Sequence, residues 1–210
     1  MKILILANSD GGLYNFRREF LEVLVKENEV YICLPKGDRI SDLEALGCKF
    51  IPCHFDRHGT NPVKELALIR FYIKTIRQVR PNVVLTYTIK PNIYGGIACA
   101  IQKVPYIVNV TGLGTAVENP GLMQKLTLTL YKLGIGKAQK VFFQNSENQA
   151  FMLSKRVVKG SYDLLPGSGV NLQRYMAKPY PDGPFIDFVF VIVYNYSRCV
   201  CFLQKIFYWR

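Results

Sequence analysis

Four short segments of the sequence are rich in small and polar residues that could bind a ligand: "NSDGG", "TYTIKPN", "NVTGLGTAVENP" and "QNSEN". Each segment follows or ends a run of apolar residues that predicts a buried strand. Ligands of open parallel sheets bind beyond the carboxyl ends of the strands. The sequence therefore predicts that these segments lie at one edge of a sheet and form the ligand site there.

Gly11 and Gly12 stand just before a predicted helix. Glycine lets a ligand approach the backbone closely, and the N-terminus of a helix favours anions. The pair is a candidate for facing a phosphate group, and the alternative is a tight turn between strand and helix. The segment is not GxGxxG, and the second predicted strand runs into Leu34-Pro35-Lys36 without an acidic residue. Both parts of the NAD-binding fingerprint are therefore missing.

Lys90 stands at the end of the fourth predicted strand, before a proline that can open a helix. A cation there could hold a phosphate group, and the alternative is an ordinary surface lysine. The next loop could hydrogen-bond sugar hydroxyls, or could be a plain connection; its small and polar residues are Asn109, Thr111, Gly112 and Gly114. Glu118, the only carboxylate of that loop, is its candidate general base.

The net charge of +12 predicts a polyanionic partner, which could be nucleic acid, an anionic membrane surface or a phosphorylated substrate. The alternative is a solvated basic surface. The predicted helix from Gly121 to Gln139 carries Lys125 and Lys132 on one stripe. A second stripe holds Leu122, Leu126, Leu130 and Leu133. A basic amphipathic helix can lie on anionic lipid, whereas the alternative is that the leucines pack on the sheet.

Six cysteines and two histidines are present, without any CxxC pair. A zinc site needs closely spaced thiolates or imidazoles, so we predict no metal site. The N-terminus lacks the pattern of a signal peptide. These features favour a reducing, cytoplasmic setting.

Strands and helices are predicted to alternate along the chain. Strands are expected at 2–8, 29–35, 48–53, 82–88, 105–112, 140–146 and 162–170. Helices are expected at 13–27, 40–47, 62–80, 91–102, 120–139 and 147–155. In the first helix the apolar residues Phe16, Phe20, Val23 and Leu24 recur at helical spacing. The alternation predicts the α/β fold class, with a doubly wound, mostly parallel sheet.

The end of the chain differs from the rest. We predict a first domain over residues 1–177 and a linker over 178–184, within the proline-rich "MAKPYPDGP". Residues 185–210 are dense in aromatic residues and begin like the first strand of another domain, which then does not continue. Asp187, Arg198 and Lys205 interrupt this run, which argues against a membrane span of roughly 18–20 residues.

Five motifs in order give the chain a family resemblance: "GGLYNFRREFLEVL", "TYTIKPNIYGGIACA", "NVTGLGTAV", "VFFQNSENQAFM" and "LLPGSGVNLQRY". Together they resemble the N-terminal domain of family-4 glycosyltransferases, most closely bacterial enzymes that build capsular, O-antigen or exopolysaccharide units. The resemblance covers about Met1 to Phe190 and stops near Val191. It implies a GT-B fold, in which two Rossmann-like domains face each other across the active-site cleft.

The resemblance also implies roles for the candidate residues. Gly11 and Gly12 would face the diphosphate of a nucleotide-sugar donor, which the missing C-terminal domain would bind with its paired glutamates. The acceptor side would be lined by Lys90, Asn92, Asn109, Thr111 and Gly112, with Glu118 nearby. Many relatives carry a histidine in the loops after strands four and five, but this chain does not. No catalytic base is therefore assigned.

The resemblance implies transfer of a sugar from a nucleotide sugar to a lipid-linked glycan, without a metal or other cofactor. The polyanion that fits the net charge is then the cytoplasmic surface of the inner membrane, not nucleic acid, and the chain would be a peripheral protein there. A truncated chain without its donor domain is expected to be inactive alone. Two alternatives remain open: the acceptor-binding or membrane-binding subunit of a two-chain transferase, and a non-enzymatic truncated product.

Overall fold

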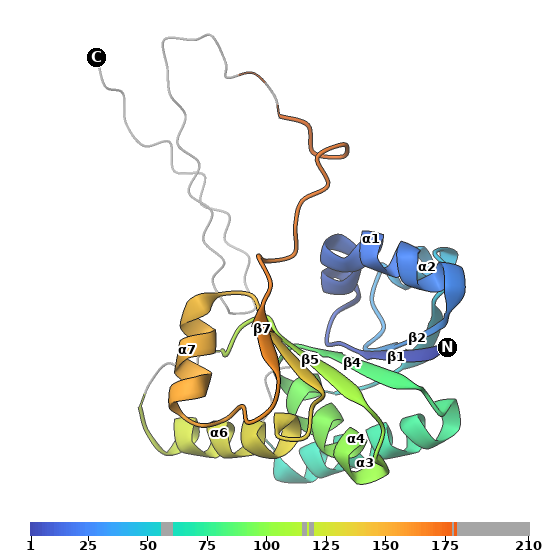
Figure 1. Cartoon of the computed structure of the whole chain (residues 1–210). Helices are drawn as coiled ribbons and strands as arrows, with labels where there is room; N and C mark the ends of the chain where they lie inside the picture. The colour runs from blue at the N-terminus through green and yellow to red at the C-terminus, as the bar shows by residue number, and fades with distance from the viewer. Residues whose placement is uncertain (56–60, 115–116, 118–119, 178, 180–210) are drawn as a thin grey trace, which may run out of the picture. The chain divides into compact units, whose positions relative to one another are not determined.

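The computed structural model describes residues 1–55, 61–114, 117, 120–177 and 179. In this part of the chain, seven parallel strands form one sheet in the order β3-β2-β1-β4-β5-β6-β7 (Figure 1). The strands are β1 (Lys2–Leu6), β2 (Glu29–Leu34), β3 (Lys49–Pro52), β4 (Val83–Tyr87), β5 (Tyr106–Val110), β6 (Lys140–Phe143) and β7 (Tyr162–Leu164). This arrangement confirms the predicted α/β fold with a doubly wound sheet.

Helices cover both faces of the sheet (Figure 1). They are α1 (Asp10–Glu27), α2 (Ile40–Ala45), α3 (Pro62–Val79), the π-helical turn η1 (Pro91–Gly95), α4 (Gly96–Gln102), α6 (Leu122–Ile135) and α7 (Ser146–Ser154). α1 and α2 lie on one face, and α3, α4 and α6 lie on the other (Figure 1). The strand order reverses between β1 and β4, which makes the carboxyl ends of these two strands the topological switch point.

The central strand β1 shows why the sequence folds in this way. Leu4 and Leu6 pack into the core on the α3 side, whereas Ile3 and Ile5 pack into the core on the α1 side. Successive side chains of a strand point to opposite faces, so a strand covered on both faces needs a continuous apolar run. The run "ILIL" meets this requirement, in agreement with the buried strand predicted from it.

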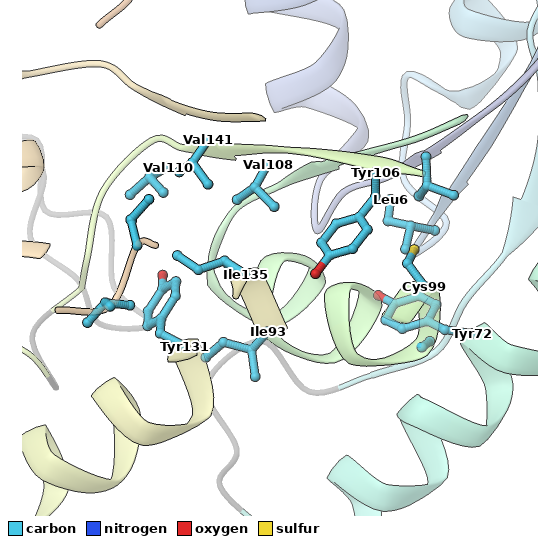
Figure 2. Packing of buried hydrophobic residues seen from close by; sticks show 14 of the residues in the cluster. Leu6, Tyr72, Ile93, Cys99, Tyr106, Val108, Val110, Tyr131, Ile135 and Val141 are labelled. Carbon is cyan, nitrogen blue, oxygen red and sulfur yellow. The ribbon is translucent and has the colours of Figure 1, made fainter. Parts of the chain in front are cut away.

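The larger core contains three fully buried tyrosines, Tyr72, Tyr106 and Tyr131 (Figure 2). The Tyr106 hydroxyl donates a 2.8 Å hydrogen bond to the carbonyl oxygen of Gly134, which ties β5 to α6. Burial raises the pKa of Tyr106 to about 12, so the hydroxyl keeps its proton and remains a donor at physiological pH. The buried Tyr106 hydroxyl thus joins the sheet to α6 within the larger hydrophobic core.

Helix α1 buries a different face from the one that its aromatic residues suggest. Leu13 and Leu21 are buried, whereas Phe16, Phe20 and Val23 are exposed. The helical spacing of these apolar residues predicted the helix but not its orientation. The reason is that α1 packs on the sheet through Leu13 and Leu21, with Leu24 partly buried against the same core, so that only Leu24 of the predicted apolar set contacts it.

The chain divides into two units, Met1–Gly169 and Val170–Arg210. All the strands and helices named above belong to the first unit. The domain boundary predicted after residue 177 stays a prediction. The tail at 185–210, and the linker at 178–184 apart from Pro179, lie outside the described residues. Among the described helices, none combines the length and apolar character that crossing a membrane would require.

Candidate functional site

A pocket of about 350 Å³ lies at the switch point of the sheet. Its wall comes from the loop before α1, the first turns of α1, and the ends of β4, β5 and β6. The residues that line it are Ala7, Asn8, Ser9, Gly12, Leu13, Phe16, Arg17, Tyr87, Thr88, Thr111, Gln144 and Ser168. All four polar segments singled out in the sequence contribute to this wall.

The loop between β1 and α1 forms the pocket wall at the start of the helix. Ser9 is the N-cap, and its Oγ accepts a 3.2 Å hydrogen bond from the Gly12 amide. Asp10 is buried, and its Oδ2 accepts a 2.8 Å hydrogen bond from the Arg39 amide. Asp10 therefore holds the loop before α2 in place, and the backbone at Gly12 faces the pocket.

The fold itself does not require glycine at positions 11 and 12. Neither residue has a positive φ angle. A Cβ atom at Gly11 would come no closer than 3.9 Å to Ser9 Oγ, and one at Gly12 no closer than 3.5 Å to Ser9 Cβ. These are ordinary van der Waals contacts, so a tight turn does not explain the two glycines.

Among the described residues, Arg17 is the only cation that lines the pocket, and sequence reasoning missed it. Its guanidinium carbon lies 5.3 Å from the centre of the Tyr87 ring, and Nη1 donates a 2.9 Å hydrogen bond to the Phe16 carbonyl. Burial raises the pKa of the Tyr87 phenol, and the neighbouring guanidinium opposes this shift. A sequence signal was present, because Arg17 lies one helical turn after the buried Leu13.

Thr88 follows β4 with a φ of +72°, which is unusual for a β-branched residue. Its Oγ1 donates a hydrogen bond to the Tyr87 carbonyl. Gln144, at the end of β6, has a buried Nε2 with no hydrogen-bond partner. Strained backbone and unsatisfied buried donors cluster at ligand sites, and both features are found at this pocket.

Lys90 is not among the residues that line the pocket. Its Nζ forms an ion pair with the carboxylate of Glu65, which lies in the first turn of α3. The other oxygen of Glu65, Oε2, is buried without a hydrogen-bond partner. Burial, with a smaller contribution from Glu65, raises the pKa of the nearby Tyr94 phenol to about 12. The ammonium group predicted to meet a phosphate is thus held within the fold.

Asn92 and Asn109 join neighbouring elements of the fold. Asn92 Oδ1 accepts a 2.8 Å hydrogen bond from Thr86 Oγ1, and its Nδ2 donates one of 2.8 Å to the Asn109 carbonyl. Both asparagines are buried. The contacts of Asn92 are therefore internal ones, which fix η1 against β4 and β5.

The remaining predicted residues fall in three places. Thr111 lines the pocket, whereas Gly112 and Gly11 are absent from its lining. Glu118 lies outside the described residues. Among the residues that the structure describes, His, Cys, Asp and Glu side chains do not gather in groups of three that could hold a metal ion.

Three of the four leucines in the predicted stripe of α6 are exposed. Leu122, Leu126 and Leu133 are 86%, 52% and 60% exposed. The core-facing side of this helix instead carries Leu128, Tyr131 and Ile135. Lys125 and Lys132 are exposed on the same outer side of the helix as the three leucines. The alternative that placed the leucines against the sheet therefore holds for Leu130, which packs partly on the core, but not for the other three, which form an apolar stripe beside two lysines.

A model of the family described as glycosyl transferase 4-like matches residues 2–145. The chain belongs to this glycosyl transferase 4-like family. This finding confirms the family resemblance of its motifs. The matched residues include the whole sheet except β7, together with the pocket lining apart from Ser168.

A curated relative of this glycosyl transferase 4-like chain is found in Campylobacter jejuni. It is named N,N'-diacetylbacillosaminyl-diphospho-undecaprenol alpha-1,3-N-acetylgalactosaminyltransferase, and it is 26% identical over 181 residues. The match covers 83% of this chain and 48% of the relative. The chain thus spans about half the length of the curated relative that it matches.

Solved structures support the same fold. A glycosyltransferase from Rickettsia africae has a TM-score of 0.61 and 15% identity, with 83% of this chain and 45% of that chain covered. Anabaena HepE, crystallised with UDP-glucose, has a TM-score of 0.58 and 16% identity, with 85% and 47% covered. This glycosyl transferase 4-like chain therefore has the fold of the N-terminal half of a GT-B structure.

Proposed function

We propose that the chain is the acceptor-side half of a glycosyltransferase that moves a sugar from a nucleotide sugar to a lipid-linked glycan. The observation that carries this proposal is the family match over residues 2–145. The Campylobacter relative, whose name describes transfer to an undecaprenol-linked sugar, supports the acceptor class. The place of the pocket at the switch point supports a ligand site in this half.

The donor would approach the pocket from the side of Gly11 and Gly12. The fold leaves ordinary space for a Cβ atom at both positions, so an approaching ligand is the better reason for glycine there. The structure of HepE with UDP-glucose supports a nucleotide sugar as the donor. In this proposal the donor would be bound mainly by the second half that the longer relatives contain.

The acceptor would reach the site from a membrane surface. The exposed leucines of α6 provide an apolar contact, and Lys125 and Lys132 provide attraction to anionic lipid. Thr111 is the predicted acceptor residue that lines the pocket. Lys90 and Asn92 would act by holding the loops around the acceptor in place, through their bonds to Glu65 and Asn109. Glu118 stays a candidate of the same loop.

A second candidate function is favoured by the coverage of the relatives. Because the chain spans about half of the curated relative, it could act as the acceptor-binding subunit of a two-chain transferase. In that case a separate donor-binding protein would complete the cleft. The two candidates share the acceptor site and differ in where the second half is encoded.

The test is flotation of the purified chain with liposomes of equal surface charge, with and without undecaprenyl-diphospho-N-acetylglucosamine. We expect the lipid-linked sugar to increase the bound fraction, and undecaprenyl phosphate without sugar to increase it less. Equal binding to all three vesicles would contradict an acceptor site. The chain alone is also expected to transfer no sugar from UDP-N-acetylglucosamine in these vesicles, and sustained turnover would show that no second half is needed.

A further inference from the structure

The pocket lining carries a positive charge, on Arg17, to which no role has yet been given. Among the described residues that line the pocket, Arg17 is the one cation, and none is a carboxylate. The same lining contains the hydroxyl of Thr111 and the amide of Gln144, whereas the Thr88 hydroxyl already donates to the Tyr87 carbonyl. A site with one guanidinium and two neutral donors fits an anionic ligand with several oxygens.

Arg17 is held in place but not neutralised. Its guanidinium lies over the Tyr87 ring, and one of its nitrogens is bonded to the Phe16 carbonyl. Among the described residues it forms no ion pair. Guanidinium has five N–H donors in a planar fork, so most of them remain available on a side chain that is already oriented.

The neighbouring arginine behaves differently. Arg18 donates from Nε to Glu22 at 2.7 Å, and its guanidinium also lies over Tyr14. It is absent from the pocket lining. The two consecutive arginines of α1 thus differ in their partners. Arg18 is paired with the Glu22 carboxylate on the surface, whereas Arg17 lines the pocket and forms no ion pair with a described residue.

Gln144, which lines the same pocket, supplies an independent observation. Its Nε2 is buried and makes no hydrogen bond among the described residues, although buried amide groups in folded proteins are nearly always satisfied. A ligand oxygen in the pocket would accept from this nitrogen. Such an oxygen would at the same time lie in the pocket that Arg17 lines.

We propose that Arg17 binds a phosphoryl group of a diphosphate in this pocket, with the Gln144 amide as a second donor. The inference rests on the proposed function for the source of the diphosphate, because both a nucleotide sugar and a polyprenyl-linked sugar carry one. The phosphate site itself is inferred from Arg17 and Gln144 in the pocket lining, independently of the proposed function. Arg17 is therefore assigned to substrate binding and not only to packing against Tyr87.

The experiment is calorimetric titration of the full chain with inorganic pyrophosphate, UDP and farnesyl diphosphate. The variants are Arg17→Gln and Arg17→Lys, and Arg18→Gln is the matched control with the same change of charge. Arg17→Gln is expected to weaken binding of pyrophosphate by about tenfold to a hundredfold, as for loss of a hydrogen-bonded charge. Arg18→Gln should weaken it less than about twofold, as for a screened surface charge.

Arg17→Lys keeps the charge and the aliphatic stem but not the fork, so an intermediate loss is expected. It also keeps the test valid if Arg17→Gln fails to fold. Tighter binding of UDP than of farnesyl diphosphate would assign the site to the donor, and the reverse would assign it to the acceptor lipid. Equal weakening by Arg17→Gln and Arg18→Gln, or no binding of any of the three compounds to the wild-type chain, would overturn the inference. Either result would leave vesicle flotation, the test of the proposed function, unaffected.

Discussion

Lys90 and Glu65 form an ion pair in which the two side chains are only 13% and 12% exposed. The pair links the loop after β4 to the first turn of α3. Removal of one partner from such a pair leaves a charge that is poorly solvated and unpaired. Lys90 therefore has a structural role in this ion pair, whichever ligand the neighbouring pocket binds.

The first prediction is that Glu65→Gln lowers the free energy of unfolding by about 3 kcal/mol, because a poorly exposed ion pair with Lys90 is lost. The double variant Glu65→Leu/Lys90→Met should recover most of this loss. Urea denaturation measures both values. Glu22→Gln, which breaks the exposed pair with Arg18, is the control and should cost about 0.5 kcal/mol or less. Equal losses from Glu65→Gln and Glu22→Gln would show that the Lys90 pair is effectively solvated.

A second prediction concerns Gly12, where stability and ligand binding should change in opposite directions. Because a Cβ atom fits there without close contact, Gly12→Ala should preserve the fold and raise the stability by about 0.5 kcal/mol. The added methyl group should at the same time weaken binding of pyrophosphate, since Gly12 lines the pocket. A thermal melt and a titration of the same sample measure the two effects. A variant that is both destabilised and unchanged in binding would restore the tight-turn interpretation.

A third prediction concerns the crossing of α4 and α6. A Cβ atom on Gly96 would lie 2.0 Å from the Gly134 carbonyl oxygen, a distance at which the backbones must separate. Gly96→Ala should therefore cost about 2 kcal/mol or more and lower the Tm by about 5 °C. Gly112→Ala is the control, because a Cβ atom at Gly112 has nothing within 4 Å. Similar melting temperatures for both variants would mean that the two helices adjust without cost.

The order of strands and helices could be predicted from the sequence because its signals are local. Apolar runs such as that of β1, and breaks at glycine and proline, depend on neighbours in the chain. The buried face of α1 could not be predicted, because Phe16 and Leu21 are equally apolar and only the position of the sheet distinguishes them.

The site was predicted in outline but not in its charges. The four segments at the carboxyl ends of the strands do line one pocket, as expected for a parallel sheet. Lys90, which was predicted to meet the ligand, is paired with Glu65 within the fold, and Arg17, which the sequence did not single out, lines the pocket. These differences arise from contacts between residues far apart in the sequence, such as Arg17 with Tyr87, which local patterns do not encode.

The last prediction is that α6 binds anionic vesicles through both its leucines and its lysines. Charge reversal by Lys125→Glu/Lys132→Glu should weaken flotation with phosphatidylglycerol vesicles at low salt, and should matter less as salt shortens the screening length below about 8 Å. Leu122→Ser/Leu126→Ser should weaken flotation at every salt concentration, because these leucines are exposed and contribute no packing to the core.

The matched control is Lys26→Glu/Lys36→Glu, which changes the net charge equally at two exposed residues, one in α1 and one between β2 and α2. If both double reversals weaken flotation equally, the attraction comes from the net charge of +12 and not from this helix. If the serine variant floats like the wild-type chain at high salt, the exposed stripe is not inserted into lipid. Loss of binding in the α6 variants alone would place the lipid contact on the outer face of α6.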